Sequence, residues 1–302
     1  MSFSEDVRRE LVARPPAKPC CGLAFLSGLI RHCGALQVRA GGELAVVAEL
    51  ADPAAARLAF SLLRDRGGDC EILSFREHRF ERRNRVLLRI AGGGSLQLLH
   101  EAGILSTGLA PLADPPERIV RRTCCRGAYL RGAFVASGSV SAPRRPAHLE
   151  LRTPEREAAE SLAAVAAREG IPMRAAVRRG NALAYLKSRE GVRDLLALIG
   201  AHDAVLSFEE AEVISATREA ANRATNCDRA NLGRASDAAH RQREAIAALD
   251  LDDLAPELRR VAELRLAHPD SSMAELGQRA RPPMTKSTVA RRMKTLIFLT
   301  KT

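Results

Sequence analysis

The chain has 302 residues, of which 46% are hydrophobic, so it is long and apolar enough to build two domains with cores of their own. Its formal net charge of +11 indicates a polyanionic partner, with nucleic acid ahead of a membrane surface. No apolar run approaches the ~18 residues that a membrane-spanning helix needs. With no Trp, two Tyr and eight Phe, the composition also disfavours a binding surface built on aromatic stacking.

One stretch occurs twice, at an offset of 104 residues. Residues 20–36 read CCGLAFLSGLIRHCGAL, and residues 124–140 read CCRGAYLRGAFVASGSV. Each contains a cysteine pair, then Ala-aromatic-Leu-x-Gly, and a second glycine six residues after the first. A self-match of this length without gaps indicates an internal duplication. We therefore expect an equivalent helix in each copy, over residues 23–33 and 126–137.

The segments that follow each copy also share one plan. Two strand-like segments, a helix, two further strands and a closing helix come after each motif helix, which predicts the order α-β-β-α-β-β-α in each half. Asp52-Pro53 supplies an N-cap and an N1 proline for the middle helix of the first half, and Thr153-Pro154 is expected to do so in the second. The pattern predicts an α+β fold with pseudo-twofold symmetry.

The C-terminal third has no strand pattern. A long polar helical segment follows the repeats, with Gly233 as the candidate interruption. Three short helices come next, and Ser272 with Glu275 forms a capping box for the second of them. The predicted domain limits are 1–19 for an N-terminal lead-in, 20–208 for the double repeat (20–110 and 118–208), 209–249 for a helical tether and 250–302 for an all-α helix-turn-helix domain.

The last of these helices, residues 285–297, has the composition of a recognition helix. Residues 285–302 contain five basic residues and no acid. Short hydroxyl side chains can contact phosphates or bases, and arginine can pair bidentately with guanine. The alternative is a solvated basic helix. The predicted DNA-binding residues are Thr285, Lys286, Ser287, Thr288, Arg291, Arg292 and Lys294.

The duplicated helix resembles the LAGLIDADG motif of homing endonucleases. The resemblance implies that the two motif helices pack side by side, with Gly28 and Gly132 allowing close approach, and that the two sheets form a saddle over DNA. In the nucleases each motif helix ends in an acidic metal ligand, and the matching positions here are Cys33 and Ser137. Metal-dependent cleavage of a phosphodiester needs carboxylate ligands, and no acid lies within a helical turn of either position, so we expect no nuclease activity.

The whole arrangement resembles the WhiA family of bacterial regulators. The matching stretches are AYLRGAF at 128–134 with GSV at 138–140, HLE at 148–150, NR at 222–223, NC at 226–227, ANL at 230–232, AELRL at 262–266, HPD at 268–270, LG at 276–277, PP at 282–283 and KS at 286–287. The resemblance implies a DNA-binding protein of cell division, chromosome segregation and sporulation. It also implies double-stranded DNA as partner, with a second transcription regulator or RNA polymerase as further candidates, and a cytoplasmic, nucleoid-associated location.

Basic residues outside the recognition helix are candidates for auxiliary phosphate contacts. Arg82, Arg83 and Arg85 lie on or beside a hairpin of the first repeat, and Arg223 lies in the tether. A solvated basic surface explains the hairpin equally well. For the tether, docking onto either domain is the alternative.

The cysteines form two adjacent pairs and three single residues. Seven cysteines with adjacent pairs do not fit a secreted disulfide framework and favour a reducing cytoplasm. Cys20-Cys21 and Cys124-Cys125 are a candidate thiolate metal site across the pseudo-twofold axis. Adjacent cysteines chelate one ion poorly, so we interpret them as small residues at helix starts and expect no metal and no cofactor.

Together these patterns predict a non-enzymatic, DNA-binding transcription regulator built on a nuclease scaffold without its chemistry. Two alternatives remain open. One is a LAGLIDADG endonuclease with unusual ligands, and the other is a protein-interaction scaffold whose positive charge is compositional.

Overall fold

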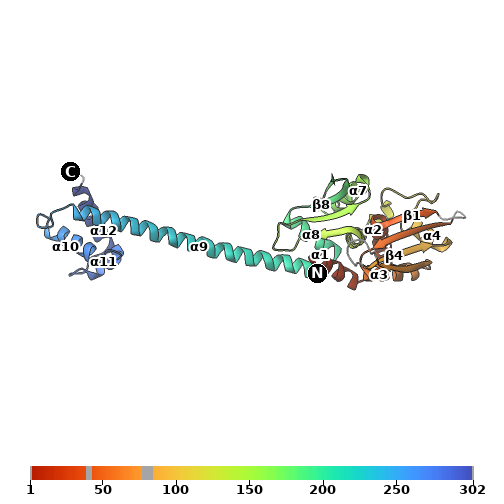
Figure 1. Ribbon diagram of the computed structural model, residues 1–302, viewed down its shortest axis with the longest axis horizontal. Coiled ribbons are helices and arrows are strands. Elements are labelled where there is room, and N and C mark those ends of the chain that lie inside the picture. Colours follow the sequence, from red (N-terminus) through yellow and green to blue (C-terminus); the bar gives the residue numbers. More distant parts are fainter. Residues whose placement is uncertain (1, 39–42, 77–83, 301–302) are drawn as a thin grey trace. The chain divides into compact units, whose positions relative to one another are not determined.

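The computed structural model describes residues 2–38, 43–76 and 84–300, in two compact units that divide between Val213 and Ile214 (Figure 1). The first unit holds both repeats, and the second holds the C-terminal helices. The helix α9 (His202–Ala247) begins in the first unit and ends in the second. No helix in the described ranges combines the length and the apolar character needed to cross a membrane.

The repeats have the predicted element order in both halves (Figure 1). The elements are α1 (Phe3–Ala13), α2 (Pro19–Cys33), β1 (Gly34–Val38), β2 (Leu44–Leu50), α3 (Pro53–Arg64), β3 (Cys70–Arg76), β4 (Asn84–Ala91), α4 (Gly93–Glu101), α5 (Glu117–Val120), α6 (Thr123–Ser137), β5 (Gly138–Val140), β6 (Leu149–Thr153), α7 (Arg156–Ala167), β7 (Arg174–Arg178), β8 (Asn181–Leu186) and α8 (Arg189–Ile199). The α+β duplication is therefore confirmed.

Each repeat forms one antiparallel four-stranded sheet. The strand orders are β1-β2-β4-β3 and β5-β6-β8-β7, so the first two strands and the last two are arranged alike in both sheets. Helix α3 packs against the first sheet and α7 against the second. One continuous hydrophobic core runs through both repeats and includes Val7 and Leu11 of α1.

The two motif helices, α2 and α6, make the most extensive contact between any two elements. Their backbones meet at two glycines. A Cβ atom on Gly132 would stand 2.7 Å from the amide nitrogen of Leu29 and closer still to the carbonyl oxygen of Phe25. A Cβ atom on Gly28 would meet the carbonyl group of Tyr129 in the same way. Only glycine permits this approach, because real Cβ atoms do not come within 3 Å of other heavy atoms.

Both motif helices begin earlier than the sequence predicts, and they include the cysteine pairs. Helix α2 starts at Pro19, which occupies the N1 position where its missing N–H costs nothing. Helix α6 starts at Thr123. Each helix ends at a glycine in extended conformation, Gly34 or Gly138, that begins the next strand.

Of the two predicted N-caps of the middle helices, one is confirmed and the other is wrong. Asp52 caps α3 as predicted, because its carboxylate accepts a hydrogen bond of 2.8 Å from the Ala54 amide. Thr153 does not cap α7, so that prediction is wrong. The β6 ladder holds Thr153 opposite Ala182, and α7 begins after Glu155. A β-branched residue fits the strand, and the pairing decides its conformation.

The second unit consists of the later part of α9 with α10 (Pro256–Ala267), α11 (Met273–Arg279) and α12 (Lys286–Leu299). Its core combines residues from all four helices: Ile246, Val261, Ala262, Leu276, Val289, Met293 and Leu296. The predicted capping box of Ser272 and Glu275 starts α11. The predicted interruption at Gly233 is wrong, since α9 continues through it. The cost of one glycine in a helix, about 1 kcal/mol, is too small to stop it.

Candidate nucleic-acid interface

The N-terminus of α12 carries a cluster of three hydroxyl groups. Thr285 is the N-cap, and its Oγ1 accepts a hydrogen bond of 3.2 Å from the Thr288 amide. The hydroxyl oxygens of Ser287 and Thr288 each lie 2.9 Å from the same Oγ1 atom. The first turn of α12 contains no acid. The hydroxyl groups therefore lie at the positive end of the helix dipole, and together they form an environment that favours a phosphate oxygen.

The rest of α12 separates an apolar stripe from a basic one. Val289, Met293 and Leu296 are buried in the core of the second unit. Arg291 and Lys294 are exposed. This spacing follows the helical period, so one face holds the helix in place and the other remains available to a ligand. Of the predicted set, the exposed residues are Thr285, Lys286, Ser287, Arg291 and Lys294.

Arg292 differs from the other predicted DNA-binding residues because it is partly buried and has a partner inside the fold. Its guanidinium forms an ion pair with Glu257 at the start of α10. The side chain is 21% exposed, against 73% for that of Glu257. The contact joins α12 to α10, which makes Arg292 a positioning residue for the helix. A DNA contact by Arg292 stays a prediction.

Two residues outside the predicted DNA-binding set hold the turns on either side of α11. Arg265 of α10 is 2% exposed, and its guanidinium donates to the carbonyl oxygens of Pro269 (3.1 Å) and Ser271 (2.6 Å) between α10 and α11. Gly277 of α11 brings the backbones of α11 and the following turn together, since a Cβ there would stand 3.2 Å from the carbonyl carbon of Met284 and closer to its oxygen. The contacts of both residues lie outside their own helices, where sequence periodicity carries no signal.

Two of the auxiliary basic candidates have a carboxylate partner in the structure. Arg85 of β4 forms an ion pair with Glu49 of β2. Arg223 of α9 lies 3.7 Å from Glu219, one turn earlier on the same exposed helix. Arg82 and Arg83 lie outside the described residues. Phosphate contacts by any of these arginines therefore stay predictions, and Arg85 would have to exchange its carboxylate partner for a phosphate.

The side chains at the positions that would carry metal ligands in a nuclease contact the backbone of their own helices. The Cys33 thiol lies 3.1 Å from the carbonyl oxygen of Leu29, and the Ser137 hydroxyl donates to the carbonyl oxygen of Ala133 at 3.3 Å. Burial raises the pKa of the Cys33 thiol to about 12, and the charge of Glu49 acts in the same direction. Neither Cys33 nor Ser137 supplies the carboxylate oxygen that Mg²⁺ prefers.

Glu49 is an acid near Cys33 that spacing along the motif helix does not reveal, because it comes from β2 and not from the same helical turn. Its carboxylate is already paired with Arg85. Among the described residues, a single cluster of three or more His, Cys, Asp or Glu side chains has its ligand atoms close enough to hold a metal ion. It consists of cysteines at the N-terminal ends of α2 and α6, whereas Cys33 and Ser137 are the last residues of these helices. The described residues therefore include no group of three or more carboxylate or histidine side chains with the proximity that a metal site needs.

Comparison with known families accounts for this combination of a double repeat and a helix-turn-helix. Residues 19–105 match the WhiA N-terminal LAGLIDADG-like domain, residues 126–218 the WhiA LAGLIDADG-like domain, and residues 221–299 the WhiA C-terminal HTH domain. The chain belongs to the WhiA family. The three WhiA matches follow one another along nearly the whole chain, so the LAGLIDADG-like and helix-turn-helix parts are both explained by one family.

Individual WhiA proteins are similar over their full length. The chain is 37% identical to the probable cell division protein WhiA of Heliobacterium modesticaldum over 302 residues, covering 98% of this chain and 95% of the relative. It is 40% identical to the WhiA protein of Desulforudis audaxviator over 304 residues, covering 98% and 96%. The crystal structure of full-length WhiA from Thermatoga maritima matches with a TM-score of 0.61 at 23% identity, covering 100% of this chain and 98% of that one. The last match supports the fold.

Proposed function

We propose that this protein is a DNA-binding regulator of bacterial cell division that reads duplex DNA with α12. The observation that carries the proposal is the exposed row of hydroxyl and cationic side chains on α12. The opposite face of this helix is apolar and buried in the core of the second unit. The net charge of +11 and the names of the relatives as probable cell division proteins support it. Roles in transcription, chromosome segregation and sporulation, a cytoplasmic and nucleoid-associated location, and a second regulator or RNA polymerase as partner belong to the same proposal.

Base reading is assigned to Arg291 and phosphate contact to the residues of the first turn. The guanidinium of Arg291 lies one helical turn after Ser287, where a recognition helix reaches base edges, and its planar fork matches guanine O6 and N7. Lys286 and the hydroxyl cluster lie at the helix end, where contacts to the DNA backbone fix register without reading sequence.

Replacing Arg291 with alanine is expected to weaken binding to a selected operator about tenfold to a hundredfold, because one bidentate base contact is lost. Binding to random duplex should weaken much less. The measurement is a fluorescence anisotropy titration on both duplexes over a range of salt concentrations, with the operator taken from selection on genomic fragments. Arg243→Ala removes the same charge from an exposed position of α9 and serves as the control. Equal loss on operator and random duplex would contradict base reading by Arg291.

The double repeat is proposed to act as a scaffold without nuclease activity. Two observations support this. The side chains of Cys33 and Ser137 contact carbonyl oxygens of their own helices, and the Glu49 carboxylate is paired with Arg85. Supercoiled plasmid incubated with the protein and Mg²⁺ or Mn²⁺ is expected to remain intact, as judged by gel electrophoresis. Metal-dependent nicking that disappears in Ser137→Ala or Cys33→Ala would contradict the scaffold proposal and favour the endonuclease alternative.

A further inference from the structure

Four cysteine sulfurs from the two repeats converge at the start of the motif helices. Each repeat contributes two, from the second and third residues of its motif helix. All four sulfur atoms lie within 4.8 Å of one another, and all four thiols are free of disulfides. We call this group the cysteine quartet: Cys20, Cys21, Cys124 and Cys125.

The spacing of the quartet fits one tetrahedral ion. Four thiolates at a Zn–S distance of about 2.3 Å stand roughly 3.8 Å apart. The Cys124 and Cys125 sulfurs are 4.0 Å apart, so an adjacent pair on this helix start already has nearly the spacing of two ligands. The Cys21 sulfur also lies 3.5 Å from the carbonyl oxygen of Cys124, which brings the two pairs together. Adjacent cysteines can therefore serve one ion here, because each helix supplies only half of the ligand set.

Burial raises the pKa of the Cys21 thiol to about 12 and that of the Cys125 thiol to about 11, so the positive charge that holds four thiolates must come from the ion and from nearby groups. The first turns of α2 and α6 contain no acid, and neither helix has a side-chain hydrogen bond at its N-cap. Both positive helix ends therefore lie beside the quartet, where they would offset part of the negative charge of a metal-bound tetrathiolate. Arg122 adds a cation, with its Nη1 atom 4.0 Å from the Cys20 sulfur. These charges offset the net charge of −2 that four thiolates and one divalent ion would carry.

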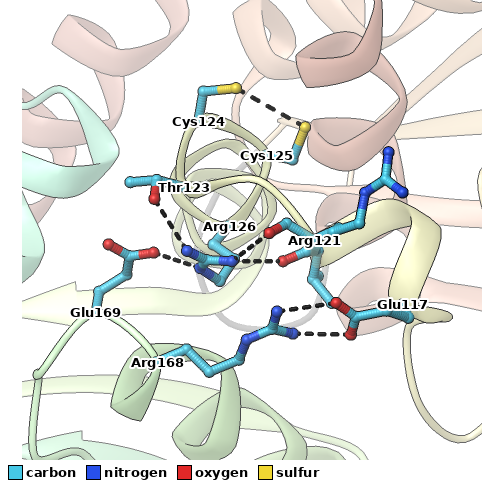
Figure 2. Close-up of polar contacts among 9 residues, drawn as sticks. Glu117, Arg121, Thr123, Cys124, Cys125, Arg126, Arg168 and Glu169 are labelled. Atoms are coloured by element: carbon cyan, nitrogen blue, oxygen red, sulfur yellow. Dashed lines mark hydrogen bonds and ion pairs between the residues drawn. The ribbon is translucent and has the colours of Figure 1, made fainter.

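A network of hydrogen bonds and an ion pair around Arg126 connects the start of α6 to its neighbours (Figure 2). Its guanidinium donates to the carbonyl oxygens of Val120 (3.1 Å) and Arg121 (2.6 Å) and to the Thr123 hydroxyl (2.9 Å), and it pairs with Glu169. Ligands held in place before binding lose less conformational freedom when the ion enters. An open cavity of about 400 Å³, lined by two residues of the quartet, gives an ion access from solvent.

We propose that the cysteine quartet binds one Zn²⁺ ion, which ties the two repeats together at the start of α2 and α6. Binding forms four Zn–S bonds in place of four S–H bonds, releases the four thiol protons to solvent and transfers no electron. Tetrahedral tetrathiolate coordination without an open position is typical of structural zinc. The ion would stabilise the folded repeat pair, because the unfolded chain does not bring residues about a hundred positions apart into one site.

The test uses the full chain, purified under reducing conditions without a metal-binding tag. We expect about one zinc per chain by elemental mass spectrometry. Replacement with Co²⁺ should give the strong visible absorption and the thiolate-to-cobalt charge-transfer bands of a tetrahedral tetrathiolate site. In alkylation mapped by mass spectrometry, the quartet should be protected when zinc is bound and reactive after chelation. Cys227, an exposed thiol of α9, should react equally in both states.

The double variant Cys20→Ser/Cys124→Ser is expected to lower Zn²⁺ affinity by at least about a hundredfold in competition with a chromophoric chelator, since half of the ligands are lost. The matched control Cys70→Ser/Cys227→Ser removes two thiols outside the quartet and should leave the affinity unchanged. If the first variant does not fold, the cobalt spectrum and the alkylation map of the wild-type protein still decide. The proposal would be overturned by absence of stoichiometric zinc binding or by equal Zn²⁺ affinity in both variants. A disulfide within the quartet of protein purified under reducing conditions would also overturn it.

Discussion

The variant Gly132→Ala is expected to lower the free energy of unfolding of the first unit by about 3 kcal/mol or more, the upper end of the cost of overpacking. The added methyl group would meet the carbonyl group of Phe25 and the amide nitrogen of Leu29, and both are backbone atoms of the opposite helix. A side chain could rotate away, but a helix backbone cannot yield without separating α2 from α6. Gly28→Ala should have a similar effect through the carbonyl group of Tyr129.

The matched control is Gly233→Ala in α9, where a Cβ atom would meet nothing within 4 Å. Alanine there should stabilise the helix by about 0.5–1 kcal/mol, because it restricts the unfolded chain more than glycine does. Hydrogen exchange resolved by peptide is the suitable measurement, since two units need not unfold in one step. Peptides from α2 and α6 should lose protection in Gly132→Ala and keep it in Gly233→Ala. Equal protection in the two variants would show that the helices separate at little cost.

The duplicated fold could be predicted because its signals are local and occur twice. Helix-stopping glycines, an aspartate N-cap and alternating strand segments each determine the conformation of a few neighbouring residues. The LAGLIDADG resemblance added what local signals lack, which is that Gly28 and Gly132 face each other. The failures have the opposite cause. Thr153 is held in β6 by pairing with a strand some thirty residues away, and α9 continues through Gly233 because its neighbours are good helix formers.

For the candidate interface, the sequence predicts the features that depend on spacing within one helix but not the contacts between different elements. The division of α12 into a buried stripe and an exposed basic face follows from spacing alone. The ion pair of Arg292 with Glu257 joins two different helices, and the proximity of Glu49 to Cys33 depends on strand pairing. The cysteine quartet is the clearest case, because its ligands come from both repeats and meet only where two helices start together.

The variant Arg265→Ala is expected to lower the free energy of unfolding of the second unit by about 3 kcal/mol or more and to remove DNA binding with it. Each hydrogen bond from a charged donor contributes about 1.5–3 kcal/mol, and the variant would leave the carbonyl oxygens of Pro269 and Ser271 without this partner. It would also open a cavity under the turn that places α11 and α12. The core of this unit is small, so a loss of this size would unfold a large fraction of the molecules.

Arg260→Ala is the control, because Arg260 is exposed on the same helix and its loss should change stability by no more than about 0.5 kcal/mol. Arg265→Lys should recover only part of the stability. An ammonium nitrogen could donate to both carbonyl oxygens, as the single Nη1 atom of Arg265 does, but it could not also reproduce the planar guanidinium whose Nη2 atom contacts the Met273 sulfur. Hydrogen exchange of α10 to α12 and DNA titration would be measured on the same samples. Loss of DNA affinity with unchanged protection would mean that Arg265 contacts DNA itself. Parallel loss of both would show that recognition by α12 depends on the buried arginine that holds the turn between α10 and α11.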